Sequence, residues 1–216
     1  LALNKPAGMT VHPGAGHEQN TLVDWLREKG VPLAHSSDAD RAGLVHRLDK
    51  DTSGLILVAK LARVAEKLMV LFAERQIEKE YRAVVQGRVP RRMLKIVGAI
   101  GRNPTDRKKF GIQTRGREAI TWIESLGESG NISFIRVIPK TGRTHQIRVH
   151  LKYAGFPILG DTVYGIRNIP GVHRMLLHAF KLGLVHPDTG KKMELTAPLP
   201  KEFVDALTGF GLSVGR

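Results

Sequence analysis

The sequence predicts an α+β fold built on a largely antiparallel sheet. Short strand-like segments follow one another with glycine- and proline-containing turns between them, and helical periodicity is confined to a few segments. Of the 216 residues, 42% are apolar and 25% are charged, which is typical of a globular chain that can bury a core. Because no repeat, low-complexity tract or long linker interrupts it, we expect a single domain over residues 1–216.

The first 80 residues predict two strands and two helices. An apolar start at Leu1–Leu3 predicts a strand, followed by a loop that includes Pro13, Gly14, Ala15 and Gly16. Thr21 is a suitable cap for a short helix that ends at Gly30, with Leu22, Trp25 and Leu26 on its buried side. After a polar stretch at 36–41, residues 54–58 predict a buried strand, and residues 64–72 repeat apolar side chains at helical spacing.

The remaining residues predict further strands, mostly joined as hairpins. Tyr81, Ala83 and Val85 alternate with their neighbours as in a strand, and residues 98–117, rich in Gly, Lys and Arg, are typical of a solvent-facing hairpin. Strands are also expected at 120–124 and 132–138 around a turn at 127–130, and at 176–185 and 192–195 around a turn at 188–190. Two helices complete the prediction, one capped by Thr144 and ending at Gly155 and one at 201–207.

The charge of the chain favours a polyanionic partner. There are 34 Lys plus Arg against 20 Asp plus Glu, a net charge of +14, and each phosphate that a basic side chain neutralises releases condensed counterions. The alternative is that the charge only keeps the protein soluble. No apolar run reaches the ~20 residues that cross a bilayer, so we expect no membrane partner. The absence of cysteine suits a reducing cytoplasm, and a start at Leu1 suggests an excised catalytic domain.

Two polar segments are the candidates for chemistry. The first, His46 to Gly54, immediately precedes a strongly apolar strand, and catalytic groups often occupy loops held by such a strand. The second, Thr141 to His150, opens onto the start of a helix, where free backbone N–H groups favour phosphates and other anions. Composition alone favours a solvated turn with exposed ion pairs for the first segment, and the second polar segment is what shifts the balance toward chemistry.

These segments resemble the RluA-type family of RNA pseudouridine synthases, with its ribosomal large-subunit members. His46-Arg47-Leu48-Asp49 with Thr52-Ser53-Gly54 is similar to the family's catalytic motif, and Lys79-Glu80-Tyr81 to the segment with the active-site tyrosine. The segment from Gly142 to Arg148 is similar to the third motif, whose last arginine pairs with the aspartate. Further matches are Asn4-Lys5-Pro6, Val11-His12-Pro13, Pro157-Ile158-Leu159-Gly160-Asp161 and Leu176-Leu177-His178-Ala179.

The resemblance implies the pseudouridine synthase fold, a mixed sheet flanked by helices with a central active-site cleft, and isomerisation of uridines in structured RNA without metal, redox cofactor or nucleotide. It implies that Asp49 is the catalytic carboxylate, as nucleophile on the sugar or as base for a 2′ proton. The residues it assigns to catalysis are Asp49, Tyr81 and Arg148; to RNA contact and base flipping, Arg47, His46, Arg143 and His145; and to the pocket wall, Leu177.

Several of these roles have a plainer alternative. Arg148 and Arg47 could contact only phosphate, Tyr81 could be buried for packing, and Leu177 could be an ordinary core leucine. We expect no metal site, because the five-residue separation of His145 and His150 places them on different helix faces. Many members of the family carry an S4-type RNA-binding domain before the catalytic one, and this sequence contains nothing like it.

Two other functions remain open at the level of the sequence. A noncatalytic RNA-binding or ribosome-assembly module could keep the fold and charge, although the Asp49, Tyr81 and Arg148 set argues against it. A hydrolytic glycosidase would need a second carboxylate, for which Asp51 is the obvious candidate. We expect a monomer that acts on RNA, with ribosomal RNA favoured over tRNA by the similarity of Val11–Gly16 to ribosomal members.

Overall fold

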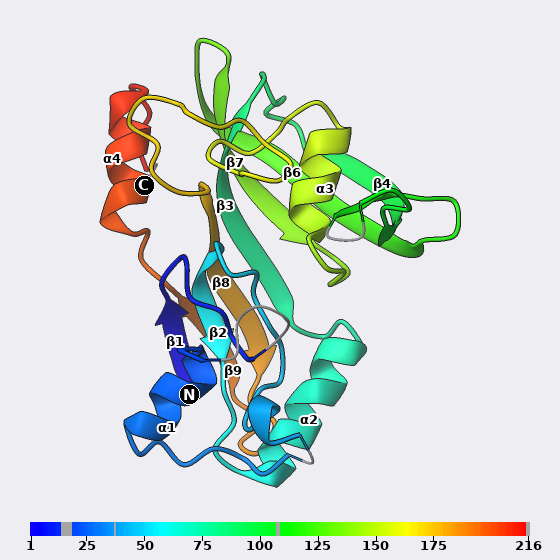
Figure 1. The fold of residues 1–216 in the computed structure, drawn as a ribbon, viewed down its shortest axis with the longest axis vertical. Helices are drawn as coiled ribbons and strands as arrows, with labels where there is room; N and C mark the ends of the chain where they lie inside the picture. The colour runs from blue at the N-terminus through cyan, green and yellow to red at the C-terminus, as the bar shows by residue number, and fades with distance from the viewer. Residues whose placement is uncertain (14–18, 37, 107–108, 215–216) are drawn as a thin grey trace. The chain divides into compact units, whose positions relative to one another are not determined.

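The computed structural model describes residues 1–13, 19–36, 38–106 and 109–214 (Figure 1). The predicted loop residues Gly14, Ala15 and Gly16 lie outside this part. The chain forms two compact units: a first unit of Leu1–Glu78 with Ala179–Pro198, and a second unit of Lys79–His178 with Leu199–Arg216. The expected single domain over residues 1–216 stays a prediction.

The first unit contains four strands and two α-helices among its described residues. The elements are β1 (Ala2–Lys5), α1 (Leu22–Glu28), a 3-10 turn at Ala39–Arg41, β2 (Ser53–Leu57), α2 (Ala62–Ala73), β8 (Leu177–Val185) and β9 (Lys192–Thr196). Strand β8 belongs to this unit from Ala179 onward. The strand order is β1-β2-β8-β9. β1 runs antiparallel to β2, and β8 runs antiparallel to β9 around the predicted turn at 188–190. Apolar side chains of β2, α2, β8 and the 34–45 region form the core.

Helix α1 confirms one prediction and corrects another. The Thr21 side chain accepts a hydrogen bond from the Asp24 backbone, and the Asp24 carboxylate accepts one from the Thr21 backbone, so the helix starts with a complete capping box. Trp25, predicted on the buried side, is 43% exposed. The reason is helical geometry: Leu22, Val23 and Leu26 define the buried face, and Trp25 lies about 100° around the helix from its centre.

The second unit contains five described strands in the order β3-β7-β6-β4-β5, with two helices. The elements are β3 (Glu78–Gln86), β4 (Leu94–Arg102), β5 (Phe110–Ile112), β6 (Arg117–Ser129), β7 (Ile132–Pro139), α3 (Gln146–Tyr153) and α4 (Lys201–Gly209). All four neighbouring pairs are antiparallel. The predicted solvent-facing hairpin exists as β4 and β5, but β4 begins four residues earlier than expected and buries Ile100.

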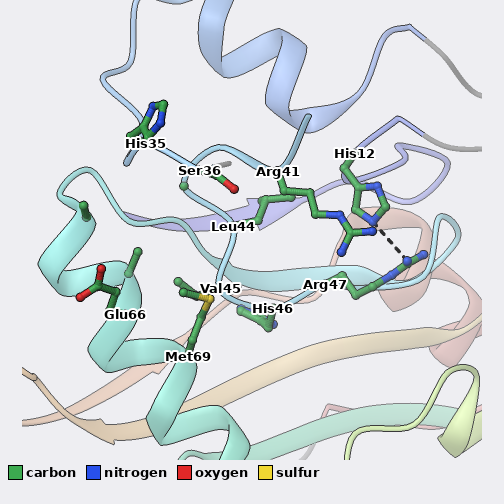
Figure 2. Close-up of a pocket in the computed structure, with 13 residues that line it drawn as sticks. His12, His35, Ser36, Arg41, Leu44, Val45, His46, Arg47, Glu66 and Met69 are labelled. Atoms are coloured by element: carbon green, nitrogen blue, oxygen red, sulfur yellow. Dashed lines mark hydrogen bonds between the residues drawn. The ribbon is translucent and has the colours of Figure 1, made fainter. Parts of the chain in front are cut away.

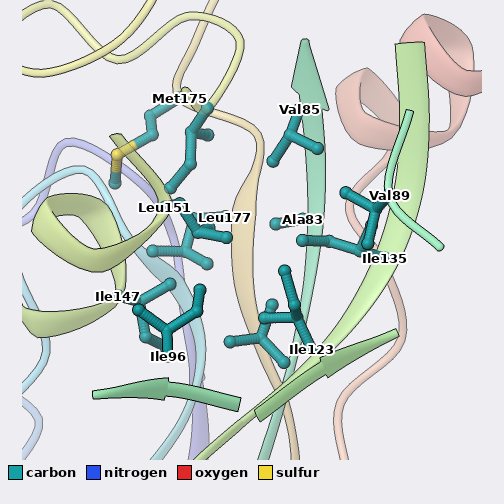
Figure 3. Close-up of a cluster of buried hydrophobic side chains, with 12 residues drawn as sticks. Ala83, Val85, Val89, Ile96, Ile123, Ile135, Ile147, Leu151, Met175 and Leu177 are labelled. Atoms are coloured by element: carbon teal, nitrogen blue, oxygen red, sulfur yellow. The ribbon is translucent and has the colours of Figure 1, made fainter. Parts of the chain in front are cut away.

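The sheet of the second unit has an apolar core on each face. On one face, Ala83 and Val85 of β3 meet Ile147 and Leu151 of α3 (Figure 3). On the other face, Val84 of β3 joins Phe203 and other apolar residues of α4. Because successive strand residues point to opposite faces, β3 contributes to both cores. The α+β fold with a mostly antiparallel sheet is therefore confirmed.

Helix α3 does not begin as predicted. Thr144 is exposed, and the capping position is His145, which adopts the left-handed conformation with φ of 55°. The Gln146 side chain instead accepts hydrogen bonds from the Thr141 hydroxyl and the Arg143 backbone N–H, so the helix start is held to residues that precede the predicted Thr144 cap. The predicted end is confirmed, because Tyr153 is the last helical residue and Gly155 follows with φ of 83°. No helix in the described ranges is long and apolar enough to cross a membrane.

Candidate active site

The loop that carries Asp49 is fixed to the end of β1 by a buried lysine. The Lys5 side chain is 1% exposed, and its ammonium donates hydrogen bonds to the carbonyls of Pro6 at 2.8 Å, Met9 at 2.9 Å and Lys50 at 3.0 Å. The Gly8 backbone N–H donates to the same Lys50 carbonyl at 2.9 Å. The carbonyl of Lys50, the residue after Asp49, therefore accepts hydrogen bonds from two donors, the Lys5 ammonium and the Gly8 backbone N–H.

The residues after Asp49 turn the chain into β2. The Thr52 backbone N–H donates to the Asp49 carbonyl at 3.1 Å, and the Asp49 side chain is half-buried. Gly54 has φ of 111°, and a Cβ atom there would lie 2.2 Å from the Ala179 carbonyl oxygen, so only glycine allows β2 to approach β8 this closely. The glycine of the Thr52-Ser53-Gly54 motif thus has a steric role.

His46 and Arg47 have different environments although they are neighbours. The His46 ring nitrogen Nε2 accepts a hydrogen bond from the Leu57 backbone N–H at 2.8 Å, and the ring stacks on Phe72 with 4.4 Å between centroids. These contacts connect the loop to β2 and α2. Arg47 is exposed, and its Nη1 lies 3.2 Å from His12 Nε2 (Figure 2). RNA contact by His46 and Arg47 stays a prediction.

The His12 ring orients the Arg47 guanidinium. His12 Nδ1 lies 2.7 Å from the Pro13 carbonyl oxygen, to which it donates, and this leaves Nε2 as the acceptor for Arg47. A neutral imidazole with its proton on Nδ1 satisfies both contacts. Two of the sequence motifs, Val11-His12-Pro13 and the one that contains Asp49, therefore meet in the first unit.

In the second unit, Arg148 forms a buried ion pair with Asp161. Arg148 Nε donates to Asp161 Oδ2 at 2.8 Å and Nη2 donates to Oδ1 at 2.9 Å, with exposed side-chain fractions of 5% and 0%. Asp161 Oδ1 also accepts from the backbone N–H groups of Val163 and Tyr164. Burial alone would raise the pKa of Asp161, but the Arg148 guanidinium and these two amides lower it below its ordinary value.

This ion pair fixes the guanidinium in one orientation, since two parallel hydrogen bonds define a plane. The Tyr164 ring lies against it, with 5.0 Å between the ring centroid and Arg148 Cζ. Gly160 precedes the aspartate with φ of 75°, and a Cβ there would lie 2.1 Å from the Arg174 carbonyl oxygen. The predicted pairing of Arg148 with Asp49, which belongs to the other unit, stays a prediction.

The segment before α3 is fixed by the buried side chain of Gln146. Its Oε1 accepts hydrogen bonds from the Thr141 hydroxyl at 2.7 Å and the Arg143 backbone N–H at 3.0 Å. Its Nε2 donates to the Ile120 carbonyl and to the Thr121 hydroxyl, both at 3.0 Å. The start of α3 is thereby attached to β6, and α3 packs against β4, β5 and β6.

His145 stands at this helix start in a conformation that few non-glycine residues adopt. Its Nδ1 lies 2.9 Å from the Tyr164 hydroxyl, which accepts a hydrogen bond from the Phe110 backbone N–H at 2.7 Å. Arg143 Nε donates to the Glu118 carbonyl at 3.1 Å. Arg143 and His145, both half-buried, thus lie beside Arg148 at the same end of α3, and their contact with RNA stays a prediction.

Leu177 belongs to the core shown in Figure 3 and is 2% exposed. Tyr81 is a partly buried side chain that packs against this core. Tyr81 pairs with Val137 of β7 and shares a strand face with Ala83 and Val85, as predicted from the alternation. The roles of Tyr81 at the substrate and of Leu177 as a pocket wall stay predictions.

His150 is buried in the second unit. Its Nδ1 lies 2.9 Å from the Thr121 hydroxyl and its Nε2 lies 3.4 Å from the Gly98 carbonyl oxygen. Burial lowers the pKa of this imidazole, although the contact with Gly98 acts in the opposite direction. Among the described residues, no group of three or more His, Cys, Asp or Glu side chains is arranged to hold a metal ion.

The structure thus collects the predicted residues in two groups. His46, Arg47 and Asp49 lie in one loop of the first unit, and Arg143, His145 and Arg148 lie at one end of α3 in the second. The sequence reasoning assigned no role to four residues that hold these groups in place: Lys5, Gln146, Asp161 and Tyr164. Lys5 and Asp161 had a signal, because each is a charged residue next to apolar strand-like sequence; Tyr164 had none.

Comparisons with known proteins identify the family of the chain. Residues 1–153 match the family model described as RNA pseudouridylate synthase. The chain is 46% identical over 200 residues to an uncharacterized RNA pseudouridine synthase of Chloroflexus aurantiacus, covering 92% of this chain and 63% of that protein. It is 39% identical over 231 residues to the ribosomal large subunit pseudouridine synthase D of Neisseria meningitidis serogroup A, covering 100% of this chain and 60% of that protein.

Two solved human structures share the fold. RNA pseudouridylate synthase domain containing 1 matches with a TM-score of 0.75 and 29% identity, covering 93% of this chain and 80% of that one. RNA pseudouridylate synthase domain containing 4 matches with a TM-score of 0.76 and 25% identity, covering 100% and 91%. The chain spans between 60% and 63% of the length of the two curated relatives above. Sequence, fold and motif residues together place the chain in the family of RNA pseudouridylate synthases.

Proposed function

We propose that the chain converts specific uridines of structured RNA to pseudouridine, with Asp49 as the catalytic carboxylate. The observation that supports this most strongly is the family match over residues 1–153, which includes Asp49, Tyr81 and Arg148. Asp49 comes from a loop held by Lys5, Tyr81 comes from strand β3, and Arg148 comes from a buried ion pair with Asp161. Catalytic groups need such support, because a small displacement of a catalytic side chain reduces the reaction rate by a large factor.

The reaction exchanges one bond for another without net oxidation. The N1–C1′ bond breaks, the uracil turns, a C5–C1′ bond forms, and the proton on C5 is lost while N1 gains one. Asp49 acts either as nucleophile on the sugar or as base for the 2′ proton. Both routes need an ionised carboxylate, and Arg148 is the proposed partner that keeps it ionised. No step of this isomerisation calls for a redox cofactor, metal or nucleotide.

The uridine must leave its stack before C1′ and C5 can be reached. We assign extrusion to Arg47 with His46, Arg143 and His145 as RNA contacts, and we assign stacking on the uracil to Tyr81, whose hydroxyl takes or relays the C5 proton. Leu177 forms the apolar wall beside it. The cationic start of α3 supports these assignments, because arginine side chains and free N–H groups favour phosphate.

The substrate we favour is large-subunit ribosomal RNA, with tRNA as the alternative. The supporting observations are the net charge of +14 and the relative from Neisseria meningitidis, whose name refers to the ribosomal large subunit. We propose that the protein acts in the cytoplasm as a monomer. Because such an RNA is a polyanion, its binding to the protein should weaken steeply as the salt concentration rises.

The two neighbouring carboxylates of the loop allow a matched test. Asp49→Asn and Asp51→Asn each remove one negative charge from the same loop, so both variants change the electrostatic attraction to RNA in the same direction and by a similar amount. With a ribosomal RNA transcript that contains tritium at C5 of uridine, we expect tritium release by the wild type and by Asp51→Asn and none by Asp49→Asn. Chemical mapping of the product identifies the modified position.

The other outcomes identify the alternatives. Tight RNA binding by the wild type without tritium release would favour the noncatalytic RNA-binding module. Release of free uracil or sugar, dependent on both Asp49 and Asp51, would favour a hydrolytic glycosidase, which needs two carboxylates. Full activity of Asp49→Asn would refute the proposed role of Asp49.

A further inference from the structure

A cavity of about 450 Å³ opens in the first unit beside Arg47 (Figure 2). Its described lining comes from three places: His12 after β1, the residues His35, Ser36, Arg41 and 43–47, and the first two turns of α2. The volume falls in the range of about 300–1,000 Å³ that is usual for ligand sites. Asp49, to which we assign the chemistry, does not line this cavity.

One end of the cavity is cationic. Figure 2 shows that Arg41, Arg47 and His12 point toward one another there. His12 fixes the Arg47 guanidinium through the 3.2 Å contact described above. Arg41 forms an ion pair with Asp38 through Nε at 3.1 Å, but both side chains are more than half exposed, so this pair competes weakly with a bound anion.

The rest of the lining is mostly apolar. Leu44 and Val45 come from the loop, and Ala65 and Met69 come from α2. Met69 is 46% exposed although it is apolar. Glu66 is the one carboxylate among the described lining residues, and it projects from α2 away from the Arg41 end in Figure 2. The cavity therefore combines a cationic end with an apolar wall.

A nucleotide has the matching shape and charge, because it joins an anionic phosphate to a base with two apolar faces. We propose that this cavity binds a nucleotide of the substrate RNA other than the uridine that reacts, with its phosphate at Arg41 and Arg47 and its base against Met69 and Leu44. The proposal rests on the proposed function, since it takes RNA as the substrate. It adds to the proposed active site a second place at which the protein holds the RNA strand.

Filling the cavity gives the first test. Ala62 lines the cavity from the exposed start of α2, so Ala62→Trp occupies it without disturbing the core. Val70→Trp adds the same ring to α2 at a position that is 50% exposed and outside the lining. With a fluorescent oligouridylate of about 20 nucleotides, we expect anisotropy titrations to show about tenfold weaker binding for Ala62→Trp and unchanged binding for Val70→Trp.

Changing the charge gives a second test that does not depend on bulk. Arg41→Gln removes one phosphate contact, so the slope of log Kobs against log[KCl] should become shallower by about 0.7. Glu66→Gln removes a repulsive carboxylate from the same cavity and should tighten binding. Opposite signs for these two variants support the site. An unchanged slope for Arg41→Gln, or weaker binding by Glu66→Gln, would count against it.

A third arm separates a nucleotide from phosphate alone. Inorganic polyphosphate of similar charge carries no base, so Ala62→Trp should lose more affinity for oligouridylate than for polyphosphate. Equal losses for both probes would show a simple anion site and would overturn the nucleotide assignment. Unchanged oligouridylate binding by Ala62→Trp, with the wild type still forming pseudouridine, would refute the cavity proposal alone. The expected binding pattern without any conversion by the wild type would refute the proposed function and leave the cavity site in place.

Discussion

The substitution Asp161→Asn tests the reasoning about the buried ion pair. Asparagine has the same shape, and its Oδ1 can still accept from Arg148 Nη2 and from the backbone N–H groups of Val163 and Tyr164. It cannot accept from Arg148 Nε, because an amide NH2 group now faces that donor, and the guanidinium loses its buried counter-charge. Removing one partner of a buried pair costs about 3–5 kcal/mol, and we expect about 3 kcal/mol because three of the four hydrogen bonds remain.

For a chain of this length, about 3 kcal/mol corresponds to a decrease in Tm of about 6–12 °C. Thermal unfolding followed by circular dichroism at neutral pH measures it. Asp205→Asn is the control, because Asp205 pairs with Lys201 on the exposed side of α4 and should change Tm by less than about 2 °C. A decrease for Asp161→Asn no larger than the control would refute the argument.

The pH dependence of this difference follows from the pKa of Asp161. Because the folded protein holds that pKa below its ordinary value of 3.8, the carboxylate stabilises the fold fully above about pH 4. As pH falls further and the folded-state carboxyl becomes protonated, this contribution is lost. The difference in Tm between the wild type and Asp161→Asn should therefore be constant near neutral pH and become smaller in acid. A difference in Tm that becomes larger in acid would contradict the proposed role of the ionised Asp161 carboxylate.

Three further substitutions test how the site is supported. Lys5→Met leaves the carbonyls of Pro6, Met9 and Lys50 without their donor, so urea unfolding should show a loss of at least about 2 kcal/mol, and an unchanged midpoint would contradict this. Gln146→Leu removes four hydrogen bonds at the start of α3 and should lower kcat, and an unchanged kcat would refute a positioning role. Thr21→Ala removes the cap of α1 and should lower the free energy of unfolding by about 1 kcal/mol with kcat unchanged, so a large loss of kcat would contradict a purely structural role for this cap.

The sequence predicted the strands and hairpins well because they depend on local signals. Alternation placed Tyr81, Ala83 and Val85 on one face of β3, and the turn at 188–190 predicted the pairing of β8 with β9. Local signals failed where a distant side chain decides the outcome. The helix after Arg143 starts at Gln146 rather than after a Thr144 cap, because the Gln146 amide also hydrogen-bonds Ile120 and Thr121 of β6.

The site shows the same division between local and distant information. The motifs identify the residues to which we assign chemistry, but their supporting contacts span large separations in sequence. Lys5 fixes the carbonyl of Lys50, and Tyr164 reaches back to Phe110 and His145. Spacing along the chain carries no record of such contacts, so Lys5 and Asp161 could be noted as motif members but not assigned their partners.

One comparison of cellular RNA tests the central claim most directly. Cells that carry the wild-type gene and cells in which the codon for Asp49 is changed to one for alanine should differ in the pseudouridine map of their ribosomal RNA. We predict that one or a few defined pseudouridines disappear in the Asp49→Ala cells while all other modifications persist. Identical maps in ribosomal RNA and tRNA from the two strains would contradict it.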